Sequence, residues 1–471
     1  MIPTALPLLR SCAGNSAYRI PILYLFSTGR KLLSSRFFTF AFAVRPLSAF
    51  VFVLLLAVSP SLLLAQNPKA LRYDIRMLTG AAMSGRGYVD KGSEKAARFL
   101  VKRLKEAGVV PATEDSGYLQ GYSFSVNTFP LPFSLKINGK ELRPGVDYLI
   151  DARSHPFESS QKKVSRLDVR RIFEKAPSGT ARREALSANG GIAFWKNADT
   201  VTKSTFLRNL PPDSLAAGLY LVPVKGKMTW TARTSRLAGG ATVVYIQDSI
   251  LPRKVRKAEV RLPSKFVPNS RQYNVCGMVR GTEVPDSFIV FTAHYDHLGE
   301  MGKGTVFPGA NDNASGTAMV LDLARYFAQK PPRYSVLFLF FSGEEAGLIG
   351  SKYYTENPLK PLENIQFLIN LDMVGECADG ATVVNGTLHP EAFARLEYLN
   401  NEARFLPKLN KRGEAANSDH YHFTQAGVPS FFLYGNGGKG HYHDVFDTAE
   451  ALSLTNTQDL QLLLIRFVAG F

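Results

Sequence analysis

The stretch Thr292-Ala-His-Tyr-Asp-His-Leu-Gly299, followed by Pro308-Gly-Ala-Asn-Asp-Asn-Ala-Ser-Gly316, decides how this chain folds. The apolar residues 289–291 come directly before it and predict a buried strand that runs into the first segment. Because alternate residues of a strand share a face, we expect His294 and Asp296 to point the same way at its end. An imidazole and a carboxylate at the carboxyl end of a strand are a common beginning of a site in an open α/β sheet.

Strand and helix patterns alternate from Tyr273 to the end of the chain. Apolar runs predict strands at Asn274–Arg280, Phe288–Ala293, Ser335–Phe341, Ile365–Asp372 and Pro429–Tyr434. Helical periodicity predicts helices at Ala314–Gln329, Ala346–Asn357, Pro390–Arg404 and from about Thr457 to Phe471. This alternation predicts an α/β fold with a mainly parallel central sheet flanked by helices.

The middle of the chain has a different character. Residues 126–271 are rich in Pro, Arg and Lys, carry short β-type runs, and predict a mostly β inserted domain. Residues 67–125 and 272–471 together would then form the main domain. Between residues 160 and 265 there are 21 Lys and Arg against 7 Asp and Glu, so most of the net charge of +17 arises here. A solvated basic face or an anionic partner would account for it, and no nucleic acid is expected because no nucleic-acid-binding motif accompanies it.

Residues 1–66 read as a leader. They hold six Lys or Arg and no Asp or Glu, and Arg45 precedes an apolar run from Leu47 to Ala65. A basic flank, an apolar core and a final small residue predict a secretory signal cleaved after Ala65. The run is also long enough for a membrane anchor. We therefore expect an extracytoplasmic protein, periplasmic or secreted.

Further carboxylates and a histidine follow the predicted strands or lie in glycine-rich loops. They are Asp312, the pair Glu344-Glu345, Asp372 and His443. Histidines with carboxylates and no cysteine suit Zn²⁺, Mn²⁺ or Co²⁺. Two such ions about 3.5–4 Å apart can share a bridging carboxylate. In an adjacent Glu pair, one side chain can bind metal while the other stays free as a base.

Taken in order, the segments "TAHYDHLG", "GANDNASG", "FSGEEAGLIGS", "NLDMVGE" and "YHDVFDT" resemble the M28 family of metallopeptidases, the co-catalytic di-zinc aminopeptidases. The resemblance covers residues 272–471 strongly and residues 67–125 more weakly. It implies two Zn²⁺ ions, with Mn²⁺ or Co²⁺ as alternatives, and peptides as substrates. The implied metal ligands are His294 and Asp372 on one ion, Glu345 and His443 on the other, and Asp312 between them.

The resemblance also implies roles for other residues. Glu344 would be the general base that activates a metal-bridging water, and Asp296 would orient His294. The peptide bond after Asp312 would be cis. Asp419 is a candidate to bind the substrate's free amino group, and Tyr434, or Tyr442, to donate a hydrogen bond to the oxyanion.

Three alternatives remain open at this point. A carboxypeptidase or dipeptidase would share the metal centre, and a glutaminyl-cyclase-like enzyme on the same fold would use one zinc. A non-catalytic, receptor-like domain would have lost ligands or the base, whereas Glu344, Glu345 and His443 are all present. The insertion occupies the place where related peptidases often carry a protease-associated domain.

Overall fold

The central sheet is built from the apolar runs that predict strands. The computed structural model describes residues 68–471 except 116, 176–178 and 197–214, so the predicted leader lies outside the described residues. The strands pair in the order β1 (Val110–Pro111), β11 (Lys265–Val279), β15 (Tyr334–Phe341), β12 (Val284–His294), β16 (Ile365–Leu371), β19 (Ser430–Gly435), β17 (Ala381–Val384) and β18 (Leu409–Lys411), with β2 (Leu119–Thr128) on β11. Strands β15, β12, β16 and β19 are parallel neighbours. The predicted α/β fold with a mainly parallel centre is confirmed.

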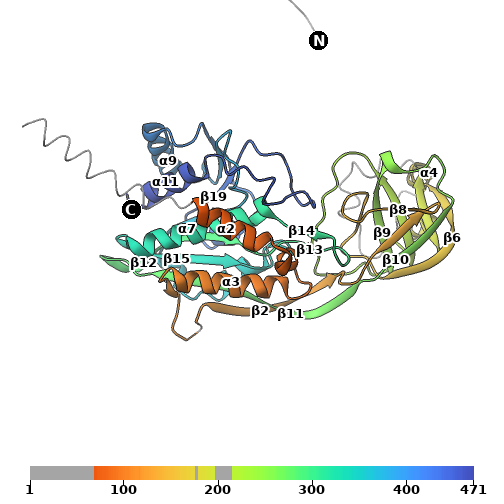
Figure 1. Ribbon diagram of the computed structural model, residues 1–471, viewed down its shortest axis with the longest axis horizontal. Helices are drawn as coiled ribbons and strands as arrows, with labels where there is room; N and C mark the ends of the chain where they lie inside the picture. The colour runs from red at the N-terminus through yellow and green to blue at the C-terminus, as the bar shows by residue number, and fades with distance from the viewer. Residues whose placement is uncertain (1–67, 116, 176–178, 197–214) are drawn as a thin grey trace, which may run out of the picture. The chain divides into compact units, whose positions relative to one another are not determined.

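Both faces of this sheet are covered, because alternate residues of its strands enter two different cores. In β12, Ile289 and Phe291 join one core cluster, whereas Phe288 and Val290 join the other. The first cluster draws on helices α2 (Pro68–Thr79), α3 (Gly92–Glu106), α7 (Gly316–Gln329), α9 (Pro390–Ala403) and α11 (Thr457–Val468). The second draws on α8 (Ile349–Glu356) and α10 (His420–Gln425). Figure 1 shows α2, α3 and α7 alongside β12 and β15.

The register of the parallel strands brings their carboxyl ends to one edge of the sheet. His294 of β12 lies opposite Phe341 of β15, two residues before the loop Gly343–Glu345. On the other side of β12, Thr292 pairs with Asn370, so Asp372 follows at the same edge. The sheet therefore delivers three of the predicted functional segments to one place.

A second sheet lies between Ser134 and Leu262. Its strands pair in the order β4 (Lys140–Glu141), β3 (Ser134–Ile137), β10 (Lys257–Leu262), β6 (Phe157–Asp168), β7 (Ile192–Lys196), β8 (Gly218–Val224), β9 (Ala241–Gln247) and β5 (Tyr148–Ile150). Strands β6 to β9 are parallel, and two short helices, α4 (Val169–Lys175) and α5 (Gly179–Ala185), follow β6. We call residues 126–271 the insertion.

The insertion is joined to the first sheet by more than chain connectivity. Strands β2 and β11 pair along their length, and Figure 1 shows them as a long ribbon. One core cluster combines Trp230 and Ile150 of the insertion with Leu298, Met301 and Phe307, which follow β12. The described helices include none that is both long and apolar enough to cross a membrane.

Candidate metal centre

The predicted metal ligands converge at the edge of the central sheet. The Nε2 atom of His294 lies 3.3 Å from Asp312 Oδ1 and 3.3 Å from Asp372 Oδ1. The Nε2 atom of His443 lies 3.1 Å from Asp312 Oδ2 and 3.1 Å from Glu345 Oε2. Asp312 thus offers one oxygen to each histidine, and the five side chains form two groups that share it.

The loop that carries Asp312 is fixed by a carboxylate from a distant segment. Both oxygens of Asp447 accept backbone N–H groups, from Asn311 at 2.8 Å and from Asp312 at 3.0 Å. The Asp312-Asn313 peptide bond is cis, as the resemblance implies. The Asn313 side chain donates to Leu371 O at 2.9 Å and so ties this loop to the end of β16.

The electrostatics of the cluster favour a bound cation. Burial acts to lower the pKa of His294, but the carboxylates of Glu344 and Asp372 outweigh it and raise that pKa well above its ordinary value. The pKa of His443 is raised in the same way: burial lowers it, and Glu345 and Asp312 more than compensate. Buried carboxylates gathered in this way need positive charge among them, which metal ions supply.

The donor set fits zinc. His294, Asp312 and Asp372 place one ligand atom each within 4.8 Å of one another, and so do His297, Asp312 and Glu345. Buried Asp372 Oδ1 makes no hydrogen bond of good geometry in the described structure, which suits a metal ligand. Imidazole nitrogens and carboxylate oxygens are the zinc ligands expected of a catalytic site.

His297 is a histidine of this cluster that the sequence alone does not assign as a ligand. It is fully buried, and its Nδ1 atom lies 2.6 Å from Glu345 Oε1. Because that contact is a hydrogen bond to a ligand candidate, His297 orients Glu345, and His443 remains the better candidate ligand. His441, two residues before His443, lies instead 3.8 Å from Asp444 at the surface.

The Asp296 carboxylate is not within hydrogen-bond distance of His294. The Nδ1 atom of His294 is 3.1 Å from the main-chain carbonyl of Asp296, but 3.8 Å from its carboxylate. The carboxylate accepts the Tyr88 hydroxyl at 2.6 Å and the backbone N–H groups of Glu344 and Glu345 at 3.3 and 3.4 Å. It therefore positions the loop that carries both glutamates, while its carbonyl orients the histidine.

Glu344 lies beside the cluster of predicted metal ligands but takes part in none of its shortest contacts. Burial raises the pKa of Glu344 well above its ordinary value, and the negative charges of Glu345 and Asp372 add to this, while His294 acts in the opposite direction. A carboxyl group with a raised pKa close to metal ligands is suited to accept and return a proton near neutral pH.

The two predicted substrate-binding residues differ in their placement. Asp419 is fully buried, and the preceding Ser418 donates to Asp372 Oδ2 at 2.9 Å. Burial raises the pKa of Asp419 to about 7, against the lowering effect of His294 and the Ser351 hydroxyl. Tyr434, by contrast, accepts a hydrogen bond from Arg412 at 3.3 Å. Tyr442 is the tyrosine beside the cluster, since its ring stacks on His443 with centroids 3.9 Å apart.

Arg86 is a structural residue of the centre that sequence reasoning missed. It lies in η1 (Ala81–Arg86), is fully buried, and donates to the carbonyls of Tyr295, Pro308 and Gly309 at 2.7–2.8 Å. These carbonyls lie in the loops on which His294 and Asp312 depend. Burial lowers the pKa of Arg86 to about 10. Its neighbour Gly87 approaches Gly299 so closely that a Cβ atom would lie 2.4 Å from the Gly299 Cα. Gly85 and Gly87, which flank Arg86, are the signal in the sequence that could indicate this position.

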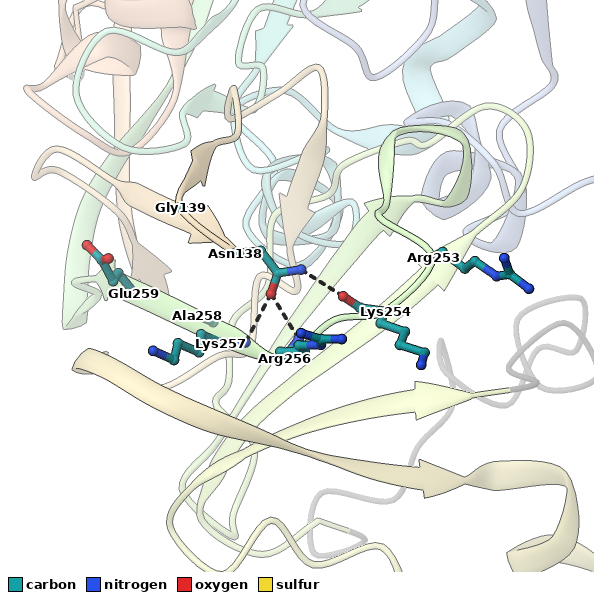
Figure 2. Close-up of a pocket in the computed structure, with 8 residues that line it drawn as sticks. All are labelled: Asn138, Gly139, Arg253, Lys254, Arg256, Lys257, Ala258 and Glu259. Carbon is teal, nitrogen blue, oxygen red and sulfur yellow. Dashed lines mark hydrogen bonds between the residues drawn. The ribbon is translucent and has the colours of Figure 1, made fainter.

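A concave surface that lies apart from the predicted ligands is found in the insertion. It measures about 890 Å³ and is lined by Asn138, Gly139, Arg253, Lys254, Arg256, Lys257, Ala258 and Glu259. Figure 2 shows the Asn138 side chain bonded to the backbone of the basic run, with Oδ1 accepting from Arg256 and Lys257. None of its lining residues is among the predicted metal ligands.

Comparison with known proteins finds a family that matches the segment carrying the centre. The family model for Peptidase family M28 matches residues 274–468. The chain is 28% identical to Aminopeptidase YwaD of Bacillus subtilis over 319 residues, which cover 61% of this chain and 68% of that protein. It is 36% identical over 209 residues to a probable zinc metalloprotease of Pyrenophora teres f. teres, of whose length it spans 43%.

Solved structures share the fold. A zinc aminopeptidase from Bacillus subtilis matches with a TM-score of 0.60 at 20% identity, covering 85% of this chain and 94% of that one. A Peptidase M28 precursor from Shewanella amazonensis SB2B matches with a TM-score of 0.65 at 16% identity, covering 88% and 95%. With the ligand cluster at the sheet edge and the family match over the same segment, residues 274–468 of this chain are a peptidase family M28 domain.

Proposed function

We propose that this protein is a di-zinc aminopeptidase that removes N-terminal residues from peptides outside the cytoplasm. The observation that carries the proposal is the position of Asp312, which offers one carboxylate oxygen to the His294 group and the other to the His443 group. A carboxylate shared in this way is the feature expected of a two-ion site. Membership of a zinc metallopeptidase family supports the same chemistry.

His294 and Asp372 would hold one ion, Glu345 and His443 the other, and Asp312 both. Zinc supplies Lewis acidity, which polarises the scissile carbonyl and makes the attacking water more acidic. The protein's own contribution is to hold the ligands before the metals bind. Asp447 fixes the loop of Asp312, Ser418 fixes Asp372, and His297 fixes Glu345.

Glu344 would act as the general base. Its backbone N–H is 3.3 Å from the Asp296 carboxylate, which sets the direction of the loop. From there the carboxylate would take a proton from the attacking water and pass it to the nitrogen of the leaving amine. Burial raises the pKa of Glu344, and the charge of Glu345 adds to this, so the carboxylate binds a proton more readily than an exposed one would.

Recognition of a free amino terminus requires a negative group that the substrate ammonium can reach. Asp419 is the candidate, since it follows Ser418, which bonds the Asp372 carboxylate, and its charge acts on Glu344. For the oxyanion, Tyr442 is better placed than Tyr434 because it stacks on His443. The leader predicted at residues 1–66 is the ground for proposing export from the cytoplasm.

The test is hydrolysis of aminoacyl-4-nitroanilides by the zinc-loaded protein, with N-acetylated versions of the same compounds as controls. We expect cleavage of the free compounds only, and loss of cleavage after chelation. Equal cleavage of free and blocked compounds would overturn the aminopeptidase assignment and leave a metallopeptidase of another specificity. Release of ammonia from N-terminal glutamine, with a pyroglutamyl residue left on the uncleaved peptide, would replace the assignment by cyclisation.

A further inference from the structure

One ligand of the metal centre is held by the insertion. The ring Nδ1 of His443 lies 2.8 Å from the main-chain carbonyl of Trp230, and the backbone N–H of Trp230 donates to the carbonyl of His443 at 3.0 Å. The two residues are 213 positions apart in the sequence. This reciprocal pair joins the insertion to the ring and the backbone of His443.

The contact leaves the other ring nitrogen of His443 as the metal-binding atom. When Nδ1–H donates to a carbonyl, Nε2 carries the free lone pair. That Nε2 is the atom 3.1 Å from both Asp312 and Glu345. The carbonyl of Trp230 therefore selects the tautomer of His443 that can bind an ion beside those two carboxylates.

The backbone of His443 needs such support. Its φ angle is 52°, in the left-handed region that residues with a Cβ atom rarely adopt. Non-glycine residues persist there when their surroundings over-determine the conformation. The two hydrogen bonds to Trp230 supply part of that determination at the ligand itself.

Trp230 is in turn anchored inside the insertion. Its indole N–H donates to Ile150 O at 2.8 Å, and its ring packs against Phe307 and Phe129 with centroids 4.9 and 5.8 Å apart. The side chain is 5% exposed. Val445, two residues after His443, packs against the same core cluster. The anchor is therefore shared by the insertion, the segment after β12 and the His443 loop.

A second tie lies on the other side of the loop. The Lys227 ammonium is 2.8 Å from the Asp444 carboxylate and also donates to the carbonyl of Gly440. Lys227 precedes Trp230 by three residues, and Asp444 follows His443 directly. The short segment 227–230 thus contacts residues 440–444 through both of its end residues, Lys227 and Trp230.

We propose that segment 227–230 of the insertion positions His443 for metal binding, so that retention of the second ion depends on the insertion. Trp230 and Lys227 are positioning residues: they act on the metal through His443 and need not touch the substrate. The inference rests on the proposed two-ion site, but it concerns metal retention rather than peptide cleavage. The zinc ion on the Glu345 side should respond to changes in the insertion, and the zinc ion on the Asp372 side should not.

The experiment measures zinc release from the holoenzyme by a chromogenic chelator, in the wild type and in Trp230→Ala, Trp230→Phe and Lys227→Met variants. Trp230→Ala keeps the carbonyl that bonds His443 but removes the indole that anchors it, and loss of the support around a metal ligand costs about 10–100-fold in metal affinity. We expect one of two ions to be released faster by a factor in this range from Trp230→Ala and by a smaller factor from Lys227→Met. Trp230→Phe, which keeps the ring packing, should restore most of the retention.

The chain offers matched controls for both residues. Trp195 is the other of its two tryptophans and lies fully buried in a different core cluster of the insertion. Lys254 lies in the basic pocket of Figure 2. Trp195→Phe and Lys254→Met should release both ions at the wild-type rate. Unchanged release from both Trp230→Ala and Lys227→Met would overturn the proposal.

Two further readouts separate positioning from general loss of structure. In Trp230→Ala, excess zinc should restore kcat while KM stays near the wild-type value, because the substrate contacts are intact. If Trp230→Ala fails to fold, Lys227→Met and a spectroscopic test decide. Cobalt, loaded in place of zinc, should quench the fluorescence of Trp195→Phe, which keeps Trp230, more than that of Trp230→Phe. Equal quenching would count against the contact.

The result is independent of the peptidase assignment. If the wild type cleaves none of the aminoacyl compounds but the variants still lose one zinc faster, the proposed function fails and the role of the insertion stands. If cleavage is as proposed and zinc release is unchanged in every variant, the proposed function stands and this inference fails.

Discussion

The two histidines of the proposed metal centre are held in different ways. His294 ends a central strand, its Nδ1 faces the carbonyl of Asp296 two residues on, and its own carbonyl accepts from Thr317 at 2.8 Å. His443 lies in a loop, has a positive φ angle, and depends on Trp230 in the insertion. Local sequence and the sheet hold the first histidine, whereas a distant segment holds the second.

The centre therefore has a His294 half and a His443 half, and the two should differ in how well they withstand substitutions. Around His294 the supporting groups are buried in the core of the central sheet, with Arg86 tying the neighbouring loops together. Around His443 the support comes from a segment whose Lys227 side chain is 43% exposed. A perturbation of the core should therefore affect the fold, and a perturbation of the insertion should affect one ion.

The largest effect is expected from Glu344→Gln. The substitution keeps the shape of the side chain but removes the proton acceptor, so kcat should fall by about 10²–10⁴-fold. Neither half of the centre is disturbed, so the zinc content should stay at the wild-type value. Glu356→Gln, on the surface at the end of α8, is the control and should leave kcat unchanged. A Glu344→Gln enzyme with wild-type kcat would remove the proposed base.

Arg86→Met should disturb the His294 half of the centre by destabilising the fold. Removing the guanidinium leaves several buried carbonyls without their donor, and losses of this kind cost about 3–5 kcal/mol. Chemical denaturation should show this loss of unfolding free energy. Arg98→Met, which breaks an exposed pair with Glu94 at 2.6 Å, should cost less than about 1 kcal/mol. Equal stability of the two variants would contradict the role given to Arg86.

Removal of zinc should destabilise the protein by an amount that free zinc sets. A ligand that binds only the folded state at 100 times its dissociation constant adds about 2.7 kcal/mol of stability. The melting temperature should fall on chelation and return with added zinc. If the halves differ as described, mild chelation should remove one ion first and give an intermediate melting temperature. A single step with both ions lost together would argue against unequal halves.

Asp151 tests the stability of the insertion next to the Trp230 anchor. Its carboxylate accepts from Arg153 at 2.9–3.0 Å and from the Tyr245 hydroxyl at 2.8 Å. Burial acts to raise the pKa of Asp151, but Arg153 outweighs it, and the pKa is lowered. A lowered folded-state pKa gives stability that is present above the unfolded value of about 3.9 and is lost as the pH falls through the folded value.

Asp151→Asn should therefore cost about 1.5–3 kcal/mol at neutral pH, and its difference from the wild type should shrink as the pH falls below about 4. Unfolding in urea at several pH values measures this, with exposed Asp248→Asn as the control that shows no such difference. A difference that grows toward acid pH would have the wrong sign for this account.

The sequence predicts the first half of the centre better than the second, for a physical reason. His294, Asp312 and Asp372 follow strands or open a helix in segments with strong local patterns, and parallel strands must end at one edge of a sheet. Trp230 and Lys227 lie in a region of weak periodicity and act through main-chain and surface contacts. Their partners are more than two hundred residues away, so no local pattern could indicate them.

Other differences between the predicted and the observed contacts have similar causes. The sequence predicts that the Asp296 carboxylate orients His294, but the carbonyl of Asp296 lies closer and the carboxylate accepts from Tyr88. Tyr434 sits in a predicted strand, yet its hydroxyl faces Arg412. A strand pattern gives the face on which a side chain lies but not its partner. The parallel order of β6 to β9 inside the insertion likewise follows from pairings that short apolar runs do not specify.

The zinc content of the purified protein tests the central claim most directly. Elemental analysis should give two zinc ions per chain for the wild type and one for His443→Ala, with the remaining ion held by His294 and Asp372. Trp195→Phe should also bind two. One zinc ion in the wild type, with no change in His443→Ala, would contradict a two-ion centre shared through Asp312.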